Sequence, residues 1–227
     1  LSTIMGHPRY EVTEGSITFD GEDVLEMEVD QRSKVGLFLG MQYPQEVPGV
    51  TNAVFLKSAL NARRETPIGL YDFVKSMESN IEKLRMKPDL AHRFLNEGFS
   101  GGEKKRNEIL QMLMLEPKIA MLDEIDSGLD IDALGIVASV LKEAIQSRDI
   151  GLMIVSHYER FFEIIEPTHT HIMMDGKIVL SGDATLVRKI DQEGYDWIDA
   201  KRADEIEHVR PESVASQALK AALGDHK

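Results

Sequence analysis

Two adjacent carboxylates, Asp123 and Glu124, follow directly after the apolar run Ile119–Leu122. A buried strand that ends in this way delivers them to the carboxyl-terminal edge of a parallel sheet, where α/β proteins bind ligands. Phosphoryl transfer needs such a pair, because one acid holds Mg²⁺ and the other orients or deprotonates the attacking water. The same pattern is typical of a strand that simply ends in a polar loop, so the pair alone does not decide between the two interpretations.

A second candidate is an anion site at the start of a helix. Ser100, Gly101 and Gly102 precede a segment with helical apolar spacing, and a serine cap followed by glycines leaves backbone N–H groups open at a helix N-terminus. Lys104–Arg106 then place positive charge in the first turn, where the helix dipole favours acids. This conflict predicts that an anion or a carboxylate lies against the turn. An ordinary cap followed by a solvated basic turn is the alternative.

Further polar residues follow other predicted strands. His157 comes after the apolar run Gly151–Val155, and Gln42 comes after Val35–Met41. Both are therefore expected at the sheet edge that carries the carboxylates, although a single histidine or glutamine there is more often structural than catalytic. Asp130 ends a Ser-Gly-Leu-Asp turn and is expected to cap the next helix.

The elements that must position these residues follow from the apolar spacing. Strand-length apolar runs at Ile119–Leu122 and Gly151–Val155 flank a helical pattern over Ala133–Gln146, which indicates a parallel sheet covered on both faces. From Val54 to Leu115 the spacing is helical and is interrupted by prolines and glycines. Two hairpins are also predicted, with their turns at Asp20-Gly21 and Asp175-Gly176.

Composition narrows the class of protein. The chain has 227 residues, of which 42% are hydrophobic, enough for one large α/β domain or two small ones. Its 39 acidic residues outnumber the 26 basic ones, which argues against sequence-independent binding of nucleic acid because that requires a basic face. The absence of cysteine excludes disulfides, thiolate catalysis and Cys-ligated metal centres within the chain. No apolar run reaches the roughly 18 residues of a membrane span, so no direct membrane insertion is expected.

The order of the motifs is more specific than any one of them. Together they resemble the nucleotide-binding domain of ABC-type ATPases, over roughly residues 1–190. The Q-loop, signature motif, Walker B motif, D-loop and switch histidine are matched, in this order, by Gln42, Phe99–Glu103, Leu122–Glu124, Ser127–Asp130 and His157. The resemblance implies an α/β fold of the P-loop ATPase kind, with a parallel-sheet core, a helical subdomain at about 50–116 and small antiparallel hairpins.

The same resemblance implies ATP and Mg²⁺ as ligands and assigns roles at the chain's own nucleotide site. Asp123 and Gln42 would hold the metal, and Gln42 would link it to the helical subdomain. Glu124 would polarise the attacking water, and His157 would contact the γ-phosphate. We also expect Lys105 to pair with a carboxylate such as Glu124 in a resting state, which partner binding would relieve.

Other roles implied by the resemblance concern a second subunit. ABC domains work as head-to-tail pairs with two ATP molecules between them. Ser100, Gly101 and Gly102 would cradle the γ-phosphate of the ATP held by the opposite subunit. Asp130 would line the dimer seam.

Longer stretches narrow the resemblance to the soluble ABC-type ATPases of the SUF iron–sulfur cluster assembly system. These stretches are Tyr43–Val50, Phe99–Asn107, Asp126–Asp132, Ser156–Tyr158 and Gly194-Tyr195. The resemblance implies an ATPase that couples ATP binding and hydrolysis to conformational change in SufB- or SufD-like scaffold proteins, in the cytoplasm or an organelle stroma. The ATPase subunit of a membrane transporter is an alternative, since such ATPases are often carried on separate chains.

One departure from the family pattern is a missing phosphate loop. No G-x-x-x-x-G-K-[ST] occurs in the 227 residues, and the only Gly-Lys, Gly176-Lys177, lies in a predicted hairpin. Leu1–Met5 is expected to be the rear of the helix that follows this loop in the family. We therefore expect an ABC domain over residues 1–198 without its N-terminal strands and phosphate loop, and a helical tail over 199–227. A truncated, non-hydrolytic ABC subunit that acts only through protein binding is the corresponding alternative.

Overall fold

The computed structural model of the chain describes residues 1–148, 150–195, 197 and 198. They fall into two compact units, one formed by Leu1–His157 and a second that begins at Tyr158. The predicted tail over 199–227 lies outside the described residues, and a domain end at 198 stays a prediction. Among the described residues, none of the helices combines the length and the apolarity that a membrane crossing requires.

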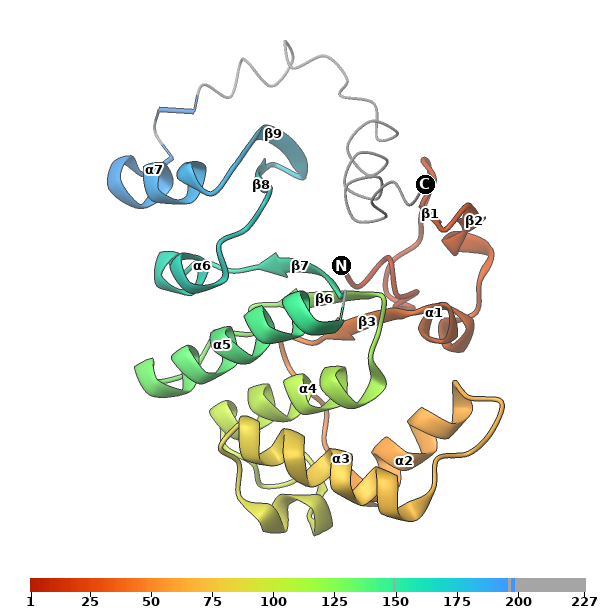
Figure 1. Cartoon of the computed structure of the whole chain (residues 1–227). Coiled ribbons are helices and arrows are strands. Elements are labelled where there is room, and N and C mark those ends of the chain that lie inside the picture. The colour runs from red at the N-terminus through yellow and green to blue at the C-terminus, as the bar shows by residue number, and fades with distance from the viewer. Residues whose placement is uncertain (149, 196, 199–227) are drawn as a thin grey trace, which may run out of the picture. The chain divides into compact units, whose positions relative to one another are not determined.

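A parallel sheet forms the centre of the first unit. Its strands β3 (Leu37–Gly40), β6 (Ile119–Asp123) and β7 (Gly151–Val155) lie in the order β3-β6-β7, as Figure 1 shows. The middle residues of β6, Ala120–Leu122, are fully buried, because this strand is paired on both edges. A strand in that position must be apolar on both faces. The predicted parallel sheet is confirmed, but the expected cover on both faces does not extend to β7, where Gly151, Met153 and Val155 are exposed.

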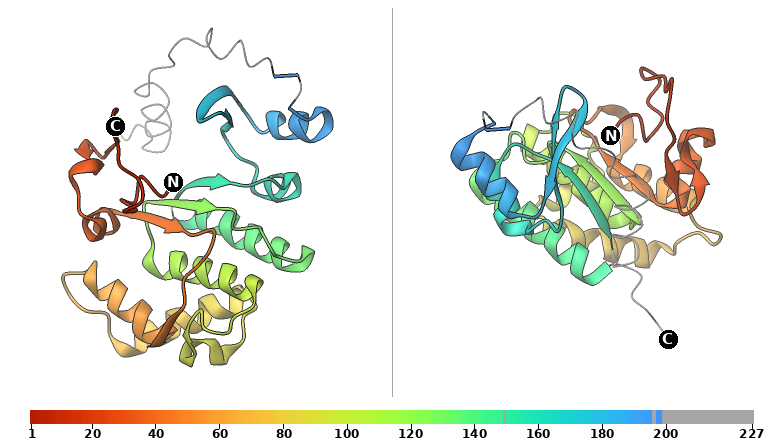
Figure 2. Two further views of the ribbon diagram at one scale, coloured as in Figure 1. Left: turned by 180° about the vertical axis from the view of Figure 1, so that it is seen from behind. Right: turned by 90° about the horizontal axis from the view of Figure 1, so that it is seen from above.

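Helices cover one face of this sheet. α5 (Ile131–Arg148) connects β6 to β7, and its buried residues recur at helical spacing. α4 (Gly101–Leu115) packs against both α5 and β3, and Figure 2 shows the two helices on the same side of the sheet from behind. The predicted start of β3 at Val35 is wrong. Val35 ends α1 (Val29–Val35), because Gly36 adopts a φ of 116° and terminates the helix.

The helical part of the first unit lies between β3 and β6 in the sequence. Its helices are α2 (Asn52–Ala62), α3 (Leu70–Lys83) and α4, with a 3₁₀ helix, η2 (Pro88–His92), before α4. The predicted helical content is confirmed. The short antiparallel pair of β4 (Val47–Thr51) and β5 (Phe94–Leu95) was not predicted, since β5 has only two residues and shows no strand pattern.

Three buried asparagines hold this helical part together. Asn107 on α4 donates from Nδ2 to Oδ1 of Asn52 at 2.8 Å and to Oδ1 of Asn96 at 2.9 Å. Asn52 in turn donates to the carbonyl oxygen of Leu90 at 3.0 Å. Because all three amides are buried, these hydrogen bonds cannot be replaced by bonds to water. The network joins α2, η2 and α4.

The N-terminal segment ends in the way that a helix ends. Leu1–Met5 consists of turns and not of a regular helix, but His7 N donates to Ser2 O at 3.1 Å and Gly6 N donates to Thr3 O at 3.0 Å, with Gly6 at a φ of 73°. This pair of bonds around a left-handed glycine closes helix C-termini, so the predicted helix end at Gly6 is supported. The Arg32 guanidinium donates to the carbonyl oxygens of Thr3 at 3.3 Å and Ile4 at 2.9 Å. Residue 8 is a proline, so the Ile4 carbonyl has no N–H donor four residues further along. The buried arginine therefore satisfies carbonyls that are left open where the segment ends.

The remaining elements of the first unit are short. β1 (Thr18–Phe19) and β2 (Glu22–Asp23) pair antiparallel around the predicted Asp20-Gly21 turn. A 3₁₀ helix, η1 (Val24–Glu26), follows directly. The buried Val24 packs with Leu37 and Met121 of the sheet, so this N-terminal layer shares the core of the unit.

The second unit contains a hairpin between two helices. Its elements are α6 (Glu159–Ile165), β8 (Thr170–Met174), β9 (Lys177–Gly182) and α7 (Thr185–Glu193). β8 and β9 pair antiparallel around Asp175-Gly176, both at positive φ, as a tight hairpin turn requires. The predicted hairpin is confirmed, and Gly176-Lys177 lies in it. Ile172, Val179 and Leu186 form the core of this unit.

The asparagine network yields a stability prediction. Asn107→Ala leaves the Oδ1 atoms of Asn52 and Asn96 without their donor, so we expect it to lower the free energy of unfolding by about 2–4 kcal/mol. Asn80→Ala is the matched control. Asn80 is similarly buried, and within the described residues its amide donates to the thioether sulfur of Met114. Asn80→Ala should therefore lower the free energy of unfolding by at least about 1 kcal/mol less than Asn107→Ala does. Urea denaturation of both variants measures the difference, and equal losses would contradict a special role for Asn107.

Candidate functional site

Glu124 stands at the centre of the candidate site. It follows the last residue of β6 and has a φ of 46°, a left-handed conformation that is unfavourable for a residue with a side chain. Its N–H donates to the carbonyl oxygen of Val155 at the end of β7, at 2.9 Å. Strained residues of this kind cluster at functional sites. The bond to β7 holds the strained turn in place.

Two other predicted residues meet the Glu124 carboxylate. Gln42 donates from Nε2 to Oε2 of Glu124 at 2.6 Å, and Nε2 of His157 lies 3.4 Å from Oε1. The side chain of Glu124 is 27% exposed and that of His157 is 72% exposed. The three residues come from the ends of the three parallel strands. The structure thus brings Gln42 and His157, which are far apart in the sequence, to the same carboxylate.

Asp123 and Asp130 lie before and after Glu124 in the chain. Asp123 is the last residue of β6 and is half-buried. Asp130 is exposed, and its Oδ1 accepts from the N–H of Ala133 at 2.8 Å. It therefore caps α5, as predicted from the sequence.

The predicted anion site is an open helix N-terminus. Ser100 caps α4 with its Oγ accepting from Glu103 N at 3.2 Å, and Glu103 Oε2 accepts from Ser100 N at 2.9 Å. This is a complete capping box. A β carbon built on Gly101 would meet no atom within 4 Å, so packing within the described chain does not require glycine here. The missing side chain leaves the backbone N–H groups of the first turn accessible.

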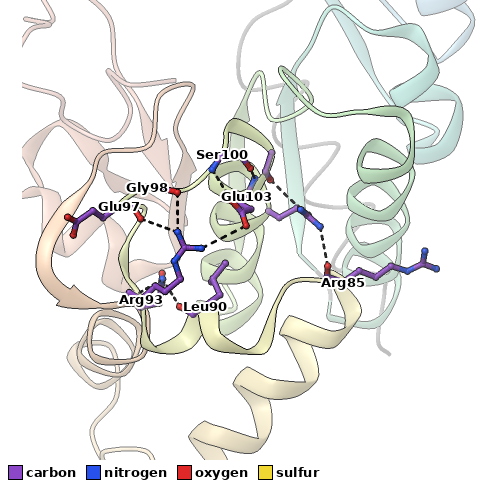
Figure 3. A network of polar contacts seen from close by, with 10 residues as sticks. Arg85, Leu90, Arg93, Glu97, Gly98, Ser100 and Glu103 are labelled. Carbon is purple, nitrogen blue, oxygen red and sulfur yellow. Dashed lines mark hydrogen bonds and ion pairs between the residues drawn. The ribbon is translucent and has the colours of Figure 1, made fainter.

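Arg93 supports this cap, and sequence reasoning missed it. Its guanidinium lies 3.9 Å from Oε1 of Glu103 and donates to the carbonyl oxygens of Glu97 at 3.4 Å and Gly98 at 3.1 Å, as Figure 3 shows. It also stacks over the ring of Phe99, 4.4 Å from the centroid. The pKa of Glu103 lies below its usual range, chiefly because its carboxylate accepts the Ser100 N–H and also faces Arg93. Arg93 showed no signal in the sequence because its contacts depend on the folded loop.

The sequence predicts that an anion or a carboxylate lies against the basic first turn of α4, and Lys104 has such a carboxylate partner. Lys104 donates to Oε1 of Glu46 at 2.7 Å. The expected pairing of Lys105 with Glu124 is wrong. Lys105 Nζ instead donates to the carbonyl oxygens of Met41 at 3.2 Å and Gln42 at 2.8 Å, and it lies 3.4 Å from that of Asp123. The ammonium is buried among these carbonyls, while Gln42 holds the glutamate.

Two buried carboxyl groups near the site were also missed. Glu108 on α4 accepts the Met41 N–H at Oε2 at 3.0 Å, and burial raises its pKa to about 7. Asp126 accepts from Ser156 Oγ at Oδ2, at 2.7 Å, and Ser156 precedes His157. The other carboxylate oxygen of Asp126, Oδ1, is buried and has no hydrogen-bond partner among the described residues. Neither residue could be recognised from the sequence, because a single acid in a helix or turn is typically exposed.

The residues at the strand ends fit a magnesium ion that is bound together with a phosphate. Within the described residues, no group of three or more His, Asp or Glu side chains could hold a metal ion by itself. Mg²⁺ does not need such a cage, since it keeps several waters and binds through one or two carboxylates and substrate phosphates. Asp123 offers a carboxylate and Gln42 an amide oxygen at the same edge.

Comparison with known proteins places this arrangement in a family. The family model for ABC transporters matches residues 1–127. Vegetative protein 296 of Bacillus subtilis is 56% identical over 214 residues, which cover 93% of this chain and 82% of that protein. A dimeric ATP-binding cassette in a post-hydrolysis state with ADP and Pi superimposes with a TM-score of 0.69 at 16% identity, covering 81% of this chain and 80% of that one.

The fold is that of the ABC ATPases, and the chain belongs to this family. The family binds nucleotides and includes ATP hydrolases. Within it, the chain is similar to the probable ATP-dependent transporter SufC of Escherichia coli, with 45% identity over 201 residues that cover 87% of this chain and 81% of SufC.

The burial of Glu108 leads to a pH-dependent prediction. Between pH 4.5 and 7 the unfolded chain releases the Glu108 proton while the folded chain retains it, so this group makes the protein less stable as the pH rises. Glu108→Gln cannot titrate but keeps an acceptor for the Met41 N–H. We expect the stability of the variant relative to wild type to increase by about 2–3 kcal/mol between pH 5 and pH 7.5. Urea denaturation at both pH values measures it, and a constant difference would contradict the buried carboxyl.

Proposed function

We propose that the protein is the ATP-hydrolysing subunit of a SUF-type iron–sulfur cluster assembly complex. In this proposal it couples ATP binding and hydrolysis to conformational change in scaffold proteins. The observation that carries the hydrolytic part is the Glu124 carboxylate, held between Gln42 at 2.6 Å and His157 at 3.4 Å. The similarity to SufC of Escherichia coli supports the choice of complex.

At the chain's own nucleotide site, Glu124 is the catalytic base that orients or deprotonates the attacking water. The hydrogen bond from Gln42 fixes the direction of its carboxylate. His157 is largely exposed, so its ring is free to contact the γ-phosphate. Asp123 and Gln42 would hold Mg²⁺, which would supply positive charge to stabilise the phosphate oxygens.

The opposite subunit completes the site in this proposal. Ser100, Gly101 and Gly102 present the N-terminus of α4 to the γ-phosphate of the partner's ATP. The empty space around a β carbon at Gly101 supports this, because a phosphate could approach the backbone there. Asp130 is the last residue of the D-loop, Ser127–Asp130. It is exposed and lines the seam between the subunits. The dimeric state of a solved cassette of the same fold, bound to ADP and Pi, supports this part of the proposal.

A surface beside Gln42 is suited to a partner protein. Tyr43 is 74% exposed, and Val47 and Phe94 on the β4–β5 pair are also exposed apolar residues. Exposed apolar patches mark protein interaction sites. We assign this surface to the scaffold, and the cytoplasm or an organelle stroma to the complex. The lack of cysteine suits a motor that does not itself carry the cluster.

A transporter ATPase is the second candidate, and the names of several relatives favour it. A protein of Streptococcus pyogenes serotype M3, 55% identical over 196 residues that cover 86% of this chain and 76% of the relative, is called a probable ABC transporter ATP-binding protein. Affinity purification of the tagged protein from its own cells separates the two candidates. Recovery with a soluble scaffold supports the SUF assignment, whereas recovery with an integral membrane protein would overturn it.

The hydrolytic role is tested on the protein expressed from its complete reading frame. We expect Glu124→Gln to lower kcat for ATP at least about 100-fold, because the water loses its base while nucleotide contacts remain. The variant should also accumulate as a dimer in the presence of ATP, measured by size-exclusion chromatography with light scattering. Glu78→Gln changes an exposed carboxylate on α3 and serves as the control. Unchanged kcat in Glu124→Gln would reject the role.

A further inference from the structure

The backbone of Met41 is held from both sides by one helix. Its N–H donates to Oε2 of Glu108 at 3.0 Å, and its carbonyl oxygen accepts from Nζ of Lys105 at 3.2 Å. The same ammonium donates to the carbonyl oxygen of Gln42 at 2.8 Å. Lys105 and Glu108 lie one turn apart on α4, so they form a clamp on the peptide groups just before the Gln42 side chain.

The clamp is made of buried charged groups. Lys105 and Glu108 are each only 5% exposed. Burial lowers the pKa of Lys105 and raises that of Glu108, and each charge partly offsets the effect on the other. Removing such groups from water is costly unless polar partners compensate. The compensating partners here are the peptide groups of one short segment, which gives the segment a defined position.

The strand end directly before this segment is closely packed. β3 ends at Gly40, where a β carbon would lie 2.9 Å from Cδ2 of the buried Leu122 and 3.9 Å from Oε2 of Glu108. Glycine thus allows the strand end to lie close to both β6 and α4. One turn earlier on α4, Lys104 holds Glu46 further along the same loop at 2.7 Å.

The clamp connects two parts of the proposed catalytic machinery. Ser100 caps α4, Gly101 and Gly102 begin it, and Lys105 follows three residues after Gly102. At the other end of the clamp, Gln42 holds the Glu124 carboxylate at 2.6 Å. A continuous chain of contacts therefore leads from the helix N-terminus through Lys105, Glu108 and Met41 to the glutamate.

We propose that Lys105 and Glu108 are positioning residues that join the start of α4 to the Met41–Gln42 segment as one rigid body. A displacement of the helix N-terminus then moves Gln42 and reorients the Glu124 carboxylate. Hydrolysis at the chain's own site is in this way controlled by what contacts its Ser100–Gly102 turn. The functional part rests on the proposed ATPase activity, whereas the clamp itself can be tested without it.

The clamp is tested first by amide hydrogen exchange in the protein expressed from its complete reading frame. Glu108→Ala removes the acceptor of the Met41 N–H, and we expect exchange in residues 41–43 to become roughly tenfold faster. Glu108→Gln retains an acceptor and should restore most of the protection. Gln111→Ala is the matched control, because Gln111 contacts only the other oxygen of Glu108, at 3.3 Å. Equal exchange in wild type and Glu108→Ala would overturn the clamp.

The positioning role is tested by ATPase kinetics on the same proteins. We expect Glu108→Ala to lower kcat about tenfold or more and to change KM for ATP less than about twofold, with kcat largely restored in Glu108→Gln. If Glu108→Ala fails to fold, Lys105→Met keeps the length of the side chain without its donors and should show the same kcat loss. A change confined to KM, or a loss of activity that only follows the unfolded fraction, would overturn the positioning role. An inactive wild-type protein would instead reject the proposed ATPase, and the exchange measurement would still decide on the clamp.

Discussion

The register of β6 between its two parallel neighbours is the constraint on which the candidate site depends. Gly40 of β3 lies opposite Leu122, and Asp123 lies opposite Val155 of β7. The residues that follow the three strands therefore emerge at one edge, where Glu124 lies close to Gln42 and His157. The unfavourable backbone of Glu124 is held by its hydrogen bond to Val155. A shift of one residue in either pairing would separate these groups.

Around this edge the protein buries several charged and polar side chains whose partners are mostly backbone groups. Lys105 binds carbonyl oxygens, Glu108 binds an N–H, and Asp126 holds the serine before His157. An apolar core at these places would be less costly to bury. Their presence suits a site in which loop positions matter more than stability, since local rules are typically broken where function requires it.

The sequence predicted the regular elements well where the apolar pattern was long. The run Gly151–Val155 is a strand with the predicted bounds, and the predicted helix after Asp130 exists with a few more residues at each end. Leu1–Met5 forms turns and not a regular helix, but it closes at Gly6 with the bonds of a helix C-terminus. The two-residue strand β5 is too short to leave a pattern of its own.

The sequence by itself determined features that depend on near neighbours or on order along the chain: the order of the motifs, the serine cap at Ser100, the cap at Asp130 and the carboxylates at a strand end. Such features depend on neighbours within a few residues. Only the tertiary structure decided the partners of Lys105, one of which, Met41, is 64 residues away in the sequence. It also brought Arg93 close to Glu103. Those choices result from competition among several acceptors, which is settled by burial and distance. Neither quantity can be read from spacing along the chain.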